Sequence, residues 1–79
     1  MFNSIIVKEI RDSQSGKAYK VGDWVLVRKK SGSVFIGQIE EIFGDSFLIC
    51  PDGFDKLIRF ADIEKMRLAD PAENLDFNF

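Results

Sequence analysis

Short apolar segments, separated by polar turns that contain glycine, are the dominant pattern along this chain. The clearest segment is a predicted strand over residues 19–29, with a turn near its start. Its alternation places Val25 and Val27 on one face and Trp24 and Leu26 on the other. We expect the valines to face the core. Because no stretch keeps a helical period, the pattern predicts an all-β fold.

Further apolar segments complete a set of five or six predicted strands. They cover residues 4–10, 34–43, 47–50 and 56–60, with a last short strand over 65–68. Residues 30–33 predict a hairpin turn, and residues 61–64 a single helical or 3-10 turn. Such strands indicate a small closed barrel or a small sandwich. We expect the barrel, because so few strands must protect their edges.

The longest segment, residues 34–43, carries two irregularities. Gly37 within a predicted strand indicates a bend or a close approach of another backbone. Ile42 shares a face with Ile39 only if a bulge follows Glu40. The remaining predicted core residues are Phe35, Ile49, Ile58, Phe60, Ile63 and Met66. More apolar residues exist than one core face can hold, so others must cover a second cluster, an interface or a ligand surface.

Composition excludes several classes of function. The 79-residue chain has no histidine, which removes the commonest general base and metal ligand, and its single cysteine cannot build a zinc site. We therefore expect no enzymatic activity, no metal and no cofactor. No apolar run approaches the roughly 18 residues of a membrane span. These features predict a cytoplasmic protein without a membrane partner, in which Cys50 is an ordinary buried thiol.

Charge is distributed unevenly along the chain. Residues 1–30 hold seven basic and three acidic residues, whereas residues 31–79 hold four basic and ten acidic ones. A basic hairpin and nearby lysines could contact phosphates. The candidate nucleic-acid residues are Lys17, Lys20, Arg28, Lys29 and Lys30. The acidic isoelectric point, about 5.0, counts against this reading.

Three segments of the chain resemble the Src-homology-3-like superfamily of small barrels, which includes Tudor, bromo-adjacent-homology, KOW and Sm-like variants. They are residues 21–27, residues 35–42 and the strand, turn and strand of residues 58–63, within about residues 19–66. The resemblance implies a barrel fold but no single function. In Tudor-like barrels, aromatic residues surround a methylated lysine or arginine through cation–π attraction. The corresponding candidates are Trp24, Phe43 and Phe47.

The chain divides into a barrel domain over residues 1–68 and an acidic tail over residues 69–79. In the tail, Leu75, Phe77 and Phe79 alternate with polar residues. This pattern resembles the peptides that dock on bacterial sliding clamps and the acidic tips of single-stranded-DNA-binding proteins. Three alternatives follow: the tail folds back as an extra strand on its own domain or a neighbouring copy, docks on a partner, or is disordered.

These observations favour a non-enzymatic protein-interaction or adaptor module that self-associates, with another protein or a second copy as partner. The first alternative is a nucleic-acid-binding barrel that uses the basic hairpin. The second is a Tudor-like reader of methylated residues.

Overall fold

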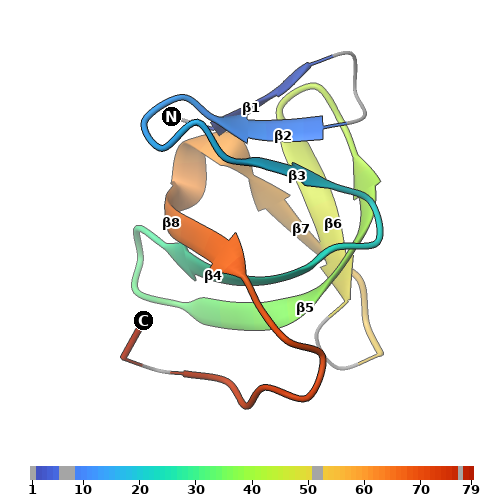
Figure 1. Cartoon of the computed structure of the whole chain (residues 1–79), viewed down its shortest axis with the longest axis vertical. Coiled ribbons are helices and arrows are strands. Elements are labelled where there is room, and N and C mark those ends of the chain that lie inside the picture. Colours follow the sequence, from blue (N-terminus) through green and yellow to red (C-terminus); the bar gives the residue numbers. More distant parts are fainter. Residues whose placement is uncertain (1, 6–8, 51–52, 77) are drawn as a thin grey trace.

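Two antiparallel sheets make up the fold in a computed structural model, which describes residues 2–5, 9–50, 53–76 and 78–79 (Figure 1). The smaller sheet has the order β1-β2-β3, from Phe2–Ile5, Glu9–Asp12 and Ala18–Lys20. The larger has the order β7-β6-β5-β4-β8. Its strands are β4 (Trp24–Lys29), β5 (Val34–Ile42), β6 (Ser46–Cys50), β7 (Lys56–Arg59) and β8 (Ile63–Leu68). A 3-10 turn, η1 (Phe60–Asp62), joins β7 to β8.

The all-β prediction is confirmed, but the prediction of one closed barrel with five or six strands is wrong. Within the described residues the strands form two separate hydrogen-bonded sheets. The difference arises because two predicted strands are each divided. Residues 4–10 contribute to both β1 and β2, in which Ser4 lies opposite Ile10. Residues 19–29 are interrupted by a turn at which Gly22 has a φ of +97°, a conformation that favours glycine.

The core lies between the two sheets. Val25 and Val27 are fully buried in it, as the alternation predicted. The other predicted core residues are also buried there, except Phe35, which packs against the core while half-buried. The core also contains residues that the sequence did not assign to it, namely Phe2, Ile10, Tyr19 and Phe47. Three of these four come from the smaller sheet, whose strands were the least well predicted.

Both irregularities predicted in β5 are present. A Cβ atom on Gly37 would lie 2.7 Å from the carbonyl oxygen of Cys50, so another side chain cannot fit without moving the backbone. The β5–β6 register shifts between Ile39 and Glu41, which leaves Glu40 as the extra residue of a bulge. The bulge returns Ile42 to the core face, where it is buried.

The last strand, β8, lies beside β4 and completes the larger sheet. It begins at Ile63, two residues earlier than predicted, since η1 covers Phe60–Asp62. The Tyr19 hydroxyl donates a hydrogen bond to the Met66 carbonyl at 3.2 Å, which ties β3 to β8. Burial raises the pKa of this hydroxyl, and the charge of Asp12 raises it further. Among the residues described, no helical segment is long and apolar enough to cross a membrane.

Candidate functional site

Leu26 identifies the surface of greatest interest. It has 0% exposed area, yet it points away from the core because it alternates with Val25 and Val27. A leucine on the outer face of a sheet is shielded from water only if another segment lies over it. The described residues of the tail, 69–76 and 78–79, run along the side of the larger sheet that faces away from β1–β3 (Figure 1). We infer that the tail covers Leu26.

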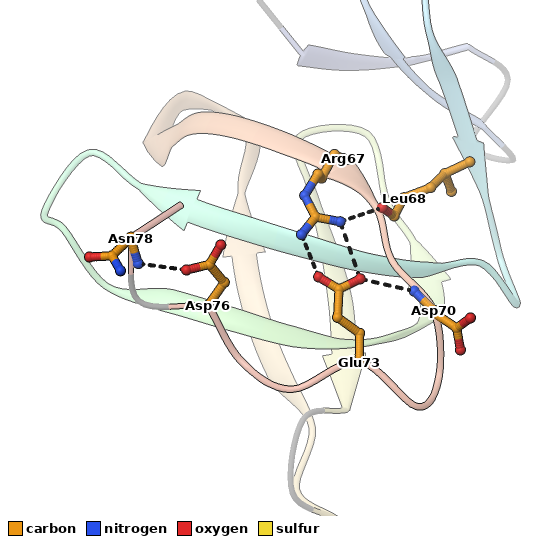
Figure 2. Close-up of polar contacts among 6 residues, drawn as sticks. All are labelled: Arg67, Leu68, Asp70, Glu73, Asp76 and Asn78. Carbon is orange, nitrogen blue, oxygen red and sulfur yellow. Dashed lines mark hydrogen bonds and ion pairs between the residues drawn. The ribbon is translucent and has the colours of Figure 1, made fainter.

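An ion pair fixes the first part of the tail to β8. The two terminal nitrogens of Arg67 donate to the two carboxylate oxygens of Glu73, a bidentate arrangement (Figure 2). Arg67 also donates to the carbonyl of Leu68 at 3.0 Å. The hydrogen bond from Arg67 lowers the pKa of Glu73, and the same bond raises the pKa of Arg67. Both shifts indicate that the charged pair is the favoured state.

A tight turn directs the tail back over the sheet. The amide of Glu73 donates to the Asp70 carbonyl at 2.8 Å, and the amide of Ala72 donates to the Asp70 carboxylate at 2.9 Å. The amide of Asp70 in turn donates to the Glu73 carboxylate at 3.3 Å (Figure 2). Pro71 occupies the second position of this turn, where its fixed φ is favourable. The turn therefore reverses the chain directly after β8.

The far part of the tail contacts β8 through an aromatic ring. The Phe79 ring centroid lies 4.6 Å from the Lys65 amine nitrogen and 5.4 Å from the central guanidinium carbon of Arg67. These are cation–π distances. Leu75 and Phe79 are both half-buried. We call the outer surface formed by Leu26, Lys65 and Arg67 the tail-binding face.

The described residues of the tail contact its own domain, which corresponds to one of the three alternatives, fold-back. Its described residues fold back on the domain, but none of them forms a strand, so the expected extra strand is absent there. Of the three candidate docking residues, Leu75 and Phe79 are placed as stated above, whereas Phe77 lies outside the described residues.

Lys65 and Arg67 were not singled out from the sequence. A signal for them was present, because two cations spaced by two residues on a strand share one face. Arg67 pairs with Glu73, and the charge of Asp76 also raises the pKa of Arg67. The face and the tail are therefore complementary in charge.

The five candidate nucleic-acid residues are not gathered in one place. Lys20 precedes β4, whereas Lys29 and Lys30 lie at its other end, about 20 Å away for a strand of six residues. Arg28 is half-buried, and its guanidinium pairs with Glu64 at 3.4 Å. Lys17 belongs to the exposed loop before β3. This separation does not favour one continuous track for a phosphate backbone.

The three candidate surface aromatics differ in how deeply they are buried. Phe47 is fully buried and stacks on Phe60, with 6.1 Å between ring centroids. Phe47 is therefore a core residue, which corrects its assignment to an aromatic surface. Trp24 and Phe43 are half-buried. The expected buried Cys50 is likewise only half-buried, because it lies on the outer face opposite Gln38.

Two shallow pockets flank the smaller sheet. One, of about 380 Å³, lies beside η1 and is lined by apolar residues such as Phe2 and Phe60, with Lys30 and Glu64 also among its lining residues. The other, of about 400 Å³, includes Lys17 and Arg67. Over the described part of the chain, no group of three or more histidine, cysteine, aspartate or glutamate residues could hold a metal ion.

The fold and the site define a small all-β domain of two sheets with its own acidic segment bound across the outer face of the larger sheet. Comparison with protein-family models, curated proteins and solved structures found no match to this chain.

Proposed function

We propose that this chain is a non-enzymatic protein-interaction module whose tail-binding face binds acidic, phenylalanine-containing segments. One observation carries the proposal: the chain's own tail is such a segment, and it is bound there. Its carboxylate pairs with Arg67 and its aromatic ring lies over Lys65.

The chemistry of the face suits this class of ligand. Leu26 supplies an apolar floor, and a bidentate arginine recognises a carboxylate with more geometric selectivity than a lysine does. The second cation, Lys65, attracts an aromatic ring rather than a second carboxylate. An extended segment with an acidic residue followed by an aromatic one can therefore pair with both cations and bind along the whole face.

We further propose that the domain is a variant of the Src-homology-3-like barrels. The 3-10 turn η1 between β7 and β8 supports this, since a strand, one turn and a strand are the ending that the resemblance implies. The larger sheet also pairs β4, its first strand in the sequence, with β8, its last strand in the sequence. Such barrels serve many tasks, so the function rests on the face and not on the fold.

The test uses a full-length chain with a released tail. Glu73→Arg places a like charge against Arg67 and should free the face. A labelled peptide of residues 69–79 with the native Glu73 should then bind this variant more tightly than the wild-type chain, as read by fluorescence anisotropy. Glu40→Arg is the matched control, because Glu40 is exposed and lies on the bulge of β5.

Three results would contradict the proposal. The released chain could fail to bind the peptide, or a peptide lacking both Glu73 and Phe79 could bind equally well. The third is that an oligonucleotide, and not the peptide, binds in a salt-dependent way and loses affinity in Lys29→Glu/Lys30→Glu, which would indicate a nucleic-acid-binding module.

A further inference from the structure

We infer that the tail-binding face also accepts the tail of a second copy, so that two chains associate by exchanging their tails reciprocally. The inference rests on the proposed function of that face, and it specifies the partner as another molecule of this chain.

The bound segment itself identifies the partner. The contacts that hold the tail on the sheet run from Glu73 to Arg67 and from Phe79 to Lys65 and Arg67. None of them requires that the two sides belong to the same molecule. A second copy presents the same carboxylate and ring at the same spacing. In an exchanged dimer both faces are therefore occupied by the native segment.

The turn over Asp70–Glu73 is the natural hinge. Its hydrogen bonds are local, since they join Asp70 only to Ala72 and Glu73. Opening this turn disrupts these local bonds, while the tail regains its contacts with the sheet on the second copy. Pro71 preorganises the reversed chain and so favours the closed monomer.

Concentration sets the balance between the two forms. A short connection gives the tail an effective concentration on the order of millimolar at its own face. The closed monomer therefore prevails in dilute wild-type protein, and exchange grows as the protein concentration approaches that range. Any change that weakens pairing within one chain, but permits it between two chains, shifts the balance strongly toward the dimer.

Two charge reversals provide that change. In Arg67→Glu and in Glu73→Arg, each chain presents like charges to its own tail. When the two variants are mixed, one interface regains Arg67 with Glu73, and the other pairs the two introduced charges in reverse. We expect each variant alone to be monomeric and the equimolar mixture to form a heterodimer, as measured by native mass spectrometry and analytical ultracentrifugation.

The double variant R67E/E73R is the control, because it restores opposite charges within one chain. It should be a monomer with a protected tail, and mixing it with either single variant should give no dimer. A mixture of the single variants that stays monomeric would overturn the inference. If the double variant then still protects its tail, the proposed function of the face stands; if it does not, that function fails as well.

Wild-type protein offers a second, independent measurement. In a millimolar mixture of differently isotope-labelled copies, exchange predicts intermolecular nuclear Overhauser effects between the Phe79 ring of one copy and the Lys65 side chain of the other. Their absence at that concentration would contradict exchange even if a charge-reversed chain failed to fold.

Discussion

Arg67 lies directly opposite Leu26 in the β4–β8 register, so the residue that binds the tail by charge stands beside the residue that we infer the tail shields from water. The two side chains share the outer face because their strands are antiparallel neighbours. Electrostatic attachment and apolar burial therefore act at the same place on the sheet. Disrupting one should weaken the other.

Removing the ring of Phe79 should loosen the tail. We expect Phe79→Ala to lower the free energy of unfolding by about 1 kcal/mol, because it removes the cation–π contact with Lys65 and part of the cover over the face. Chemical denaturation measures the change. Phe54→Ala is the matched control, since Phe54 is 79% exposed and its loss should cost less than about 0.5 kcal/mol. Equal effects of the two substitutions would argue against a bound tail.

Leu26 should behave as a core residue although it faces outward. We expect Leu26→Ala to cost about 2–5 kcal/mol, the range for a fully buried leucine. Leu57, on edge strand β7, is 54% exposed, and Leu57→Ala should cost far less. Thermal unfolding followed by circular dichroism compares the two variants. A small loss at Leu26 would mean that the tail does not cover it.

The ion pair predicts an acid-dependent loss of tail binding. Because the pKa of Glu73 is lowered in the folded chain, its contribution to stability is complete above the ordinary glutamate value, about 4.3, and is lost as the pH falls through the lowered value. The difference in melting temperature between wild type and Glu73→Gln should thus be positive at pH 6 and become progressively smaller as the pH falls below the ordinary glutamate value. A difference that persists unchanged at pH 3 would rule out the charged pair as its source.

Gly37 should be intolerant of any side chain. Gly37→Ala places a methyl group against the Cys50 carbonyl and should destabilise the β5–β6 pairing by about 1–3 kcal/mol. Gly44→Ala is the control, because a Cβ atom there would meet nothing within 4 Å. Urea denaturation curves of both variants measure the contrast. Similar midpoints for the two variants would show that a methyl group at residue 37 is accommodated without loss of stability.

The parts of the fold that follow from local alternation were predictable. Val25 and Val27 face the core as expected, and the bulge at Glu40 follows from the need to return Ile42 to that face. The division of residues 4–10 into two strands was not predictable, because an apolar, β-branched run is equally compatible with one strand or with two. Phe47 was misassigned although alternation along β6 places it on the same face as Ile49, which was assigned to the core.

The candidate site was only partly predictable. The alternating apolar residues of the tail left fold-back, docking and disorder open; in the structure Phe79 contacts Lys65 and Leu75 is half-buried. The face that receives them depends on β8 lying beside β4, a pairing between segments about 40 residues apart in the sequence. Local pattern carries no information on such a pairing, so Lys65 and Arg67 were identified only in the folded chain.

The accessibility of the Leu26 methyl groups tests the central claim most directly. A soluble paramagnetic probe can be added to the methyl-labelled full-length chain, with Val27 as the internal control on the core face. In wild-type protein, we expect both residues to be protected. In Glu73→Arg, relaxation should increase at Leu26 and stay unchanged at Val27. Leu26 methyl groups that remain as protected as those of Val27 after release of the tail would contradict the account.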